Sequence, residues 1–284
     1  MDDDLTGPTL SVVVNTRNAA LTLEACLRSV LGWADEVVVM DQESEDGSAA
    51  LATALGAKVF SMKPTGIVEP ARAQAVAEAT GDWILILDAD EVVTKELRAS
   101  LRAVLRDPPA DVFQVPRRNR VFGLEMTTGP FAPVRDRQTR LFRAGTVVFS
   151  DVVHTPAAAV PGSRVGALPL EGGALIHLAY VDLGDFVERN ARYSRIEAER
   201  RHALGDAPRL GQACAQAARR LVAGLTKHRG LRGGWRGIHV SLLWALGPLW
   251  IDAWQRQLRE VGDRRAVVTA DLEVARSHAV DERG

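Results

Sequence analysis

The stretch that decides the fold reads Trp83-Ile84-Leu85-Ile86-Leu87-Asp88-Ala89-Asp90-Glu91. An apolar run leads into carboxylates, as expected where a buried strand ends at the edge of a sheet. Side chains alternate along a strand, so Asp88 and Asp90 are predicted to project on the same side. Two neighbouring carboxylates need a cation or polar partners to stay ionised. Mg²⁺ or Mn²⁺ fits, because these hard ions take oxygen ligands and share them with phosphates. The stretch therefore indicates an enzyme that handles a nucleotide diphosphate.

The sequence around this stretch alternates between two hydrophobic periods. Short apolar strands are predicted at residues 10–14, 36–40, 58–61 and 83–87, with helical segments between them and a further helix at 94–106. This rhythm predicts an α/β sheet with right-handed crossovers. The ligand site of such a sheet lies outside the carboxyl ends of its strands. Asn15, Asp41 and Asp88 each follow a strand, so they are predicted to converge on one edge.

The second half of the chain changes character. After residue 110 short strands are predicted in an irregular order, the first at residues 112–116, and from residue 183 the pattern is helical. We therefore expect a nucleotide-binding and catalytic domain at residues 1–180. A helical region at residues 181–284 is expected to associate with a membrane or to dimerise.

Composition excludes several classes of protein. The chain has 284 residues, of which 46% are hydrophobic and 25% charged, so wholesale disorder is not expected. A formal net charge of −1 gives no nucleic-acid signature. Cys26 and Cys214 form no zinc pattern or disulfide framework, which favours a reducing cytoplasm. The acidic N-terminus does not read as a secretory signal, and no apolar run is long enough to predict a membrane-spanning helix.

Two polar segments after the first and second strands carry further candidates. Residues 15–18 read Asn-Thr-Arg-Asn, whose short polar side chains suit a base or ribose. The alternative is a turn that starts a helix, with Asn18 as its cap. Residues 41–48 begin with Asp41, which suits a nucleoside donor group, or they form a plain acidic turn.

Taken together, these segments resemble the family 2 glycosyltransferases, whose single nucleotide-sugar-binding domain has the GT-A fold. The matching pieces are residues 11–18, 41–48, 79–91, 136–142 and 175–183. Their order is similar to the lipopolysaccharide-core branch, whose members add a hexose to a heptose-containing core. The resemblance implies a mixed, Rossmann-like sheet flanked by helices, with a helical C-terminal extension. It also implies metal-dependent, inverting transfer of a hexose from a nucleotide-diphosphate sugar to a cell-envelope glycan or glycolipid.

The resemblance implies roles for individual residues. The candidate nucleotide-sugar ligands are Asn15, Arg17, Asn18, Asp41, Arg72, Asp88, Arg137 and Arg140. The candidate metal ligands, for Mg²⁺ or Mn²⁺, are Asp90, Asp88 and His177. Simpler interpretations stay open: Arg72 as a solvated helix charge, Arg137 and Arg140 as an exposed strand face, and His177 as a structural histidine.

Two positions depart from the family pattern. Ala19 follows Asn18 where the family usually has an acid. Thr155 follows Val153-His154 where the branch usually has the glutamate that would act as catalytic base. Asp151 or Asp136 is therefore the candidate base that accepts the acceptor hydroxyl's proton.

The segment 238–254 is strongly apolar, carries three tryptophans and follows several basic residues. This pattern suits a helix lying on an anionic membrane, which would make the enzyme peripheral on the inner face of the cytoplasmic membrane. The alternative is a helix packed on the domain or on a second copy of the chain. Two competing functions also stay open, a sugar nucleotidyltransferase and a non-catalytic, membrane-associated assembly protein.

Overall fold

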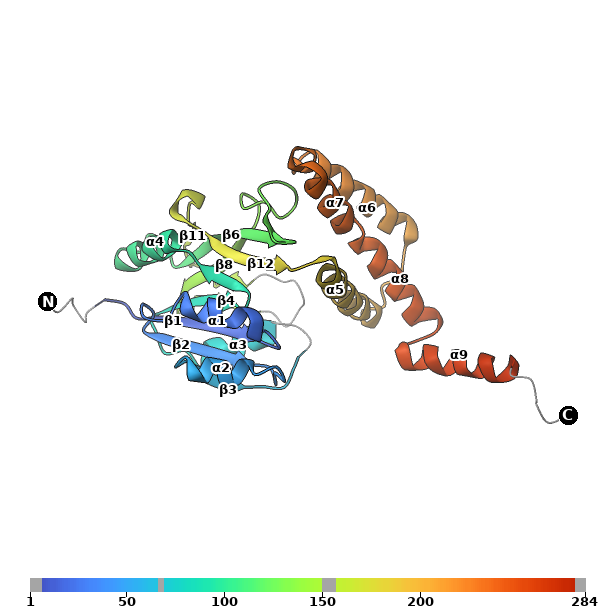
Figure 1. Ribbon diagram of the computed structural model, residues 1–284, viewed down its shortest axis with the longest axis horizontal. Helices are drawn as coiled ribbons and strands as arrows, with labels where there is room; N and C mark the ends of the chain where they lie inside the picture. The colour runs from blue at the N-terminus through green and yellow to red at the C-terminus, as the bar shows by residue number, and fades with distance from the viewer. Residues whose placement is uncertain (1–6, 66–68, 150–156, 279–284) are drawn as a thin grey trace. The chain divides into compact units, whose positions relative to one another are not determined.

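The computed structural model describes residues 7–65, 69–149 and 157–278. The chain forms two compact units (Figure 1). The first unit runs to Thr127 and resumes at Phe131–Asp182, and the second contains Thr128–Pro130 and the chain from Leu183 onward. Each unit is described by itself.

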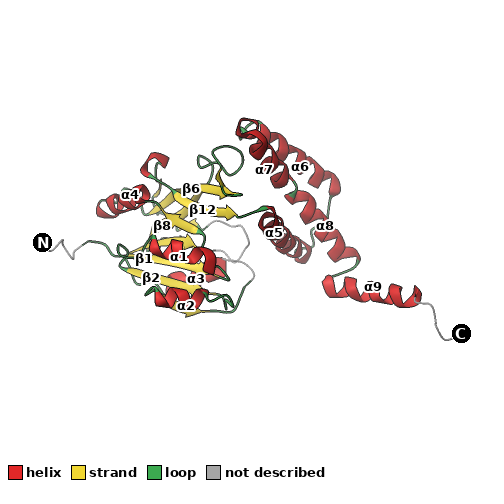
Figure 2. Cartoon of the chain, viewed as in Figure 1, coloured by secondary structure: helices red, strands yellow, loops and turns green. Residues whose placement is uncertain are grey.

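A ten-stranded mixed sheet forms the centre of the first unit (Figure 2). Its main path runs β3-β2-β1-β4-β8-β6-β12-β5, with β7 and β11 paired to β6. The strands are β1 (Leu10–Thr16), β2 (Glu36–Asp41), β3 (Lys58–Ser61), β4 (Trp83–Asp88), β5 (Glu91–Val93), β6 (Val112–Val121), β7 (Leu124–Glu125), β8 (Arg137–Arg143), β11 (Val165–Ala167) and β12 (Leu175–Tyr180). The pair β9 (Val147–Val148) and β10 (Ala158–Ala159) is separate. Strands β1 to β4 are parallel, and β8 joins β4 antiparallel.

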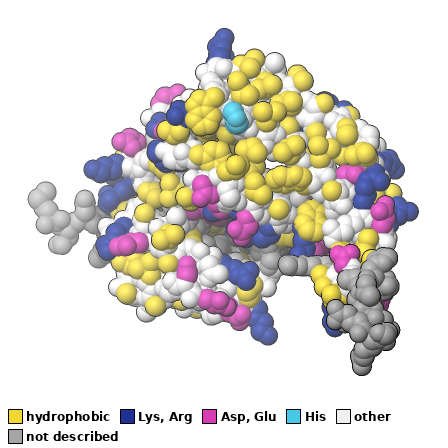
Figure 3. Space-filling model, turned by 45° about the vertical axis from the view of Figure 1, so that its right-hand side comes forward, with side chains coloured by type: hydrophobic (Ala, Val, Ile, Leu, Met, Phe, Trp, Pro, Cys, Tyr) yellow, Lys and Arg dark blue, Asp and Glu magenta, His cyan; other side chains and the backbone are white. Residues whose placement is uncertain are grey.

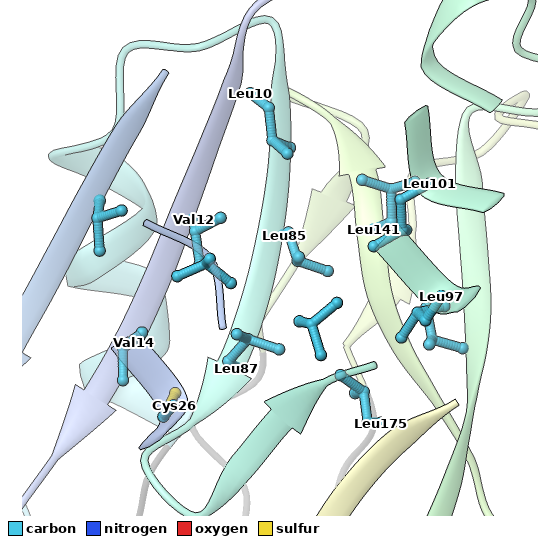
Figure 4. Packing of buried hydrophobic residues seen from close by; sticks show 14 of the residues in the cluster. Leu10, Val12, Val14, Cys26, Leu85, Leu87, Leu97, Leu101, Leu141 and Leu175 are labelled. Carbon is cyan, nitrogen blue, oxygen red and sulfur yellow. The ribbon is translucent and has the colours of Figure 1, made fainter. Parts of the chain in front are cut away.

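Helices cover both faces of the sheet, and strand alternation decides which residues meet them. The helices of this unit are α1 (Ala20–Arg28), α2 (Ser48–Ala54), α3 (Glu69–Ala77), α4 (Lys95–Arg106) and the 3-10 turn η1 (Leu170–Gly172). Val12 and Leu85 point to one face and pack with Leu97 of α4 (Figure 4). Val13 and Ile84 point to the other face, where α3 lies. The predicted α/β architecture with a mixed sheet is thus confirmed.

A buried carboxylate joins the parallel strands at the end opposite the candidate site. Glu36 accepts hydrogen bonds from the Ser11 hydroxyl at 2.5 Å, the Lys58 ammonium at 2.6 Å and the Thr80 backbone N–H at 2.8 Å. Burial raises the pKa of Glu36, but these donors outweigh it and lower the pKa to about 2. The ionised side chain therefore fixes three strands at one end of the sheet.

The second unit is helical. Its elements are α5 (Leu183–Ala203), α6 (Leu210–Leu225), η2 (Gly230–Gly233), α7 (Gly234–Ala245), α8 (Gly247–Glu260) and α9 (Arg264–His278). Small residues let α6 and α7 approach closely: a Cβ atom on Gly224 would lie 2.8 Å from Cβ of Ser241. None of the described helices is both long and apolar enough to cross a membrane.

Candidate active site

The carboxyl ends of three parallel strands meet at one edge of the first unit's sheet. The strand register places Asn15 of β1 beside Asp88 of β4, and Thr16 beside Asp41 of β2. The predicted convergence of Asn15, Asp41 and Asp88 is therefore confirmed as geometry. Their roles stay predictions.

Several polar atoms at this edge are buried without a hydrogen-bond partner in the described part of the chain. They are Oδ1 and Nδ2 of Asn15, Oγ1 of Thr16 and Oδ1 of Asp41. The other oxygen of Asp41 accepts from the backbone N–H of Ser44 at 3.0 Å. A buried polar group without a partner costs about 1–3 kcal/mol, so such groups rarely gather in one place by chance. The edge presents donors and acceptors suited to a polar ligand.

The other polar candidates nearby make bonds within the protein. Asn18 has a positive φ of 50° and accepts from the backbone N–H of Glu45 at 2.8 Å, so it ties the first loop to the second. Arg17 is exposed. Arg137, at the start of β8, donates to the carbonyl oxygen of Leu168 at 2.5 Å. The contacts of Asn18 and Arg137 account for their positions without a ligand.

Asp88 lies between two arginines. It accepts from Arg72 with one oxygen and from Arg140 with the other, each at 2.5 Å. Burial raises the pKa of Asp88, but the two guanidinium groups outweigh it and hold the pKa well below its usual range. Arg140, only 3% exposed, also donates to the fully buried Glu91 at 2.6 Å. Because β4 ends at Asp88, the strand alternation that predicted a common side for Asp88 and Asp90 does not extend to Asp90.

Asp90 lies instead beside His177. After the turn, β5 pairs antiparallel with β12 and sets Glu91 opposite His177. An oxygen of Asp90 then lies 3.6 Å from Nε2 of His177. The other ring nitrogen, Nδ1, lies 2.6 Å from the side-chain oxygen of Asn119 on β6. Because an amide oxygen only accepts, Nδ1 carries a proton that it donates to Asn119, and Nε2 is the ring nitrogen that faces Asp90.

Asn119 is itself held by a carboxylate. Its amide group donates to Asp136 at 2.7 Å, and Asp136 also accepts from Arg117 at 2.9 Å and from Gln138 at 2.8 Å. Burial raises the pKa of Asp136, but Arg117, Asn119 and Gln138 outweigh it and lower the pKa. These bonds give Asp136 a role in fixing Asn119. The other candidate base, Asp151, lies outside the described residues, as does Thr155.

Sequence reasoning did not single out Glu91, Arg117 or Asn119, and it included Thr16 only as part of the polar segment at residues 15–18. Glu91 directly follows the acidic pair and was visible as a third carboxylate. Arg117 and Asn119 lie in the polar half of β6, beyond the apolar stretch that predicted a strand. Only the pairing of β6 with β12 reveals that Asn119 faces His177.

Comparison with known proteins identifies the fold's relatives. The family model described as glycosyl transferase family 2 matches residues 11–152, half of the chain. An uncharacterised glycosyltransferase of Rickettsia bellii is 31% identical over 149 residues, which cover 51% of this chain and 50% of that protein. A TPR repeat-containing protein of Synechococcus elongatus is 40% identical over 47% of this chain and 31% of its own length. The chain thus spans half or less of the length of these curated relatives.

Among solved structures, S. aureus TarS 1–349 in complex with UDP is 17% identical, with a TM-score of 0.47 over 89% of this chain and 91% of that one.

The family match covers β1 to β8 and includes the edge at which Asn15, Asp41, Asp88 and Asp90 lie. The chain belongs to glycosyl transferase family 2.

Proposed function

We propose that the protein transfers a hexose from a nucleotide-diphosphate sugar to a cell-envelope glycan or glycolipid, with inversion at the anomeric carbon. The observation that carries this proposal is the set of buried polar atoms on Asn15, Thr16 and Asp41 that have no hydrogen-bond partner among the described residues. A nucleoside offers hydroxyl groups, ring nitrogens and carbonyl oxygens at short spacing, so it can pair donors and acceptors together. Family membership supplies the reaction class.

A divalent ion, Mg²⁺ or Mn²⁺, fits beside the nucleoside edge. Asp90 supplies a hard oxygen ligand, and the hydrogen bond from His177 to Asn119 directs the Nε2 lone pair to the same place. The described residues contain no cluster of three or more His, Cys, Asp or Glu side chains suited to an ion. Two protein ligands are what a nucleotide-dependent site needs, since the donor's phosphates complete the coordination. When bound, the ion neutralises charge on the departing nucleoside diphosphate.

The charged side chains around Asp88 position the donor. Asp88 stays ionised at neutral pH because Arg72 and Arg140 lower its pKa. Its two oxygens are taken by these arginines, which compete with the metal-ligand role that its spacing predicts. Nε of Arg72 is buried and has no partner in the described residues. We assign this group to the donor's diphosphate, since a guanidinium binds phosphate oxygens well.

The proton of the acceptor hydroxyl needs a carboxylate base. A base works best when its pKa lies near the operating pH, and the pKa of Asp136 is shifted away from that range. Its oxygens are also occupied by Arg117 and Asn119. We therefore assign Asp136 to positioning and retain Asp151 as the candidate base.

A binding screen with an isosteric variant tests the nucleoside site. Thermal shifts and calorimetry with several nucleoside diphosphates, each with and without Mn²⁺, should find at least one that binds in a metal-dependent manner. Asp41→Asn removes the charge at the unpaired oxygen and should weaken that binding by about tenfold, the loss of one charge-assisted hydrogen bond. Glu43→Gln removes an exposed charge from the same loop and should leave binding unchanged.

Turnover separates the proposed reaction from its alternatives. A transferase slowly hydrolyses its nucleotide sugar in the absence of acceptor and releases nucleoside diphosphate. A nucleotidyltransferase would instead consume a nucleoside triphosphate and release pyrophosphate. An assembly protein would show neither activity. Absence of metal-dependent nucleotide binding together with absence of hydrolysis would refute the proposed function.

A further inference from the structure

The second unit contains a long segment of one charge sign. Between Asp206 and Asp252 the sequence has seven Lys or Arg residues, from Arg209 to Arg236, and no Asp or Glu. The whole chain has a formal net charge of −1, so the positive charge is concentrated in this segment. All of these basic side chains except Arg220 are exposed. The segment comprises α6, η2, α7 and the start of α8.

Helix α7 lies within this segment and carries apolar side chains on both of its faces. Its inner face carries the buried residues Gly237, Val240 and Ser241, of which Ser241 lies against α6 and Gly237 against η2. The opposite face carries Trp235 and Leu242, which are 61% and 44% exposed. Residues seven apart lie on the same face of a helix, so these two side chains form one stripe. The inner contacts explain the fold of α7 but not the apolar outer stripe.

Basic and apolar groups are interleaved on this outer face. Leu231 of η2 is exposed before α7 begins, and Leu246 is exposed where it ends. The Arg236 guanidinium lies 5.0 Å from the centre of the Trp235 ring, and Arg232 is exposed in η2. Figure 3 shows hydrophobic side chains gathered at the top of the view with a Lys or Arg side chain at their rim. We call Leu231, Trp235, Leu242 and Leu246, with Arg232 and Arg236, the α7 outer face.

We propose that the α7 outer face docks on the surface of an anionic phospholipid bilayer. Tryptophan and leucine side chains enter the boundary between headgroups and acyl chains, while arginines pair with lipid phosphates. Basic residues near the surface add attraction to acidic lipids. Helix α7 has 12 residues, so it suits a position in the plane of the membrane surface.

Charge distinguishes this partner from a second copy of the chain. In a two-fold symmetric dimer the same patch meets itself. The α7 outer face would then face a copy that carries the same arginines, with no acid in the segment to pair with them. A bilayer with acidic lipids offers the complementary charge. This inference deepens the proposed glycolipid acceptor, but vesicle binding is measured without donor or acceptor, so either proposal can fail alone.

Vesicle sedimentation with the full chain tests the proposal. The protein should bind vesicles of phosphatidylcholine mixed with phosphatidylglycerol far more strongly than vesicles of phosphatidylcholine alone. Added salt should weaken this binding, because exposed charges are screened. Equal binding to both vesicle types, or no binding to either, would overturn the proposal.

Two double variants locate the surface. Arg232→Gln with Arg236→Gln should weaken binding by about thirtyfold, since each basic residue near the surface contributes about fivefold. Trp235→Ser with Leu242→Ser should weaken it by about tenfold or more. The matched control, Val268→Ser with Leu272→Ser, changes two similarly exposed apolar residues of α9 and should bind as the wild type does.

The same variants also test the alternative partner of this face, a second copy of the chain. Each variant should keep the wild-type circular dichroism spectrum and melting temperature, because the changed side chains are exposed. If the α7 variants convert a dimer into a monomer in sedimentation velocity and leave vesicle binding intact, the face is a self-association surface and the proposal is wrong. An equal loss of vesicle binding in the α9 control would also contradict it.

Discussion

Asn119 should set the metal affinity of the site although it is not predicted to touch the ion. Asn119→Ala removes the acceptor that lies 2.6 Å from Nδ1 of His177 and two donated bonds, to Phe131 and Asp136. Without the acceptor, the imidazole is free to rotate and to protonate at Nε2. Losing a hydrogen-bond partner of a metal-binding histidine typically costs about 10- to 100-fold in affinity. We expect a loss in that range for Mn²⁺ in the presence of the nucleoside diphosphate found by the binding screen.

Stability changes must be separated from this effect. Three lost hydrogen bonds at about 1 kcal/mol each lower the free energy of unfolding by about 3 kcal/mol. Asn119→Asp keeps an acceptor for His177 but replaces the donor to Asp136 with a like charge. It should therefore also be destabilised, yet retain a wild-type tautomer and Mn²⁺ affinity within a few-fold. Both variants should thus be less stable than the wild type, but only Asn119→Ala should lose metal affinity by tenfold or more.

Two measurements decide the outcome. Electron paramagnetic resonance titration gives the Mn²⁺ affinity, and ¹⁵N nuclear magnetic resonance of the His177 ring gives the tautomer without any metal. The reasoning is refuted if Asn119→Ala keeps both the wild-type affinity and the Nδ1-protonated ring. It is also refuted if Asn119→Asp loses as much affinity as Asn119→Ala.

Four further outcomes are expected. Asp90→Ala should lower metal-dependent turnover by about a hundredfold or more and leave the fold intact by circular dichroism; wild-type turnover would show that Asp90 is not a metal ligand. Thr16→Val replaces a buried hydroxyl that has no partner within the described part of the chain with a methyl group, so nucleoside binding should weaken in calorimetry and the free protein should melt at a higher temperature. A variant with weaker binding and a lower melting temperature would contradict this. Glu36→Gln should cost about 3 kcal/mol in urea unfolding at neutral pH, and because the folded pKa is lowered to about 2, its difference from wild type should shrink as the pH falls from about 4.5 toward 2. Burial, and then the neighbouring carboxylates, raise the pKa of the Cys26 thiol, so a thiol reagent should modify only the exposed Cys214 in the native protein and both thiols after unfolding.

The parallel half of the sheet was predictable because its signals are local. Strands β1, β2 and β4 are short apolar runs that are buried on both faces, and their polar residues follow directly at the carboxyl ends. Once the α/β rhythm is recognised, parallel pairing alone brings Asn15, Asp41 and Asp88 together. No long-range information is needed for this edge beyond the order of the strands.

The part of the site proposed to bind a metal, around Asp90 and His177 and called the metal side below, was not predictable in the same way, because it depends on pairings distant in sequence. The apolar pattern predicted a strand at residues 112–116, but β6 continues to Val121 through three arginines and Asn119. These polar residues belong to the strand because Arg117 pairs with the buried Glu91 of β5, and Asn119 bonds to Asp136 just before β8 and to His177 of β12. Similarly, β5 has only three residues and is defined by its pairing with β12. Hydrophobic periodicity does not show which residues distant in sequence pair with one another.

The two sides of the site differ in how their polar groups are satisfied, and this difference suggests how the site works. On the metal side, hydrogen bonds connect Glu91, Arg117, Asp136, Asn119 and His177 in one continuous series within the protein. Buried ion pairs of this kind add little net stability, because desolvation offsets their attraction. What they provide is a fixed position for the imidazole before any ion arrives.

On the nucleoside side, buried donors and acceptors lack partners in the described chain. A ligand that supplies those partners gains their full hydrogen-bonding energy without first displacing protein contacts. The donor's nucleoside should therefore contribute most of the binding energy, while the pre-oriented metal side directs it to the diphosphate.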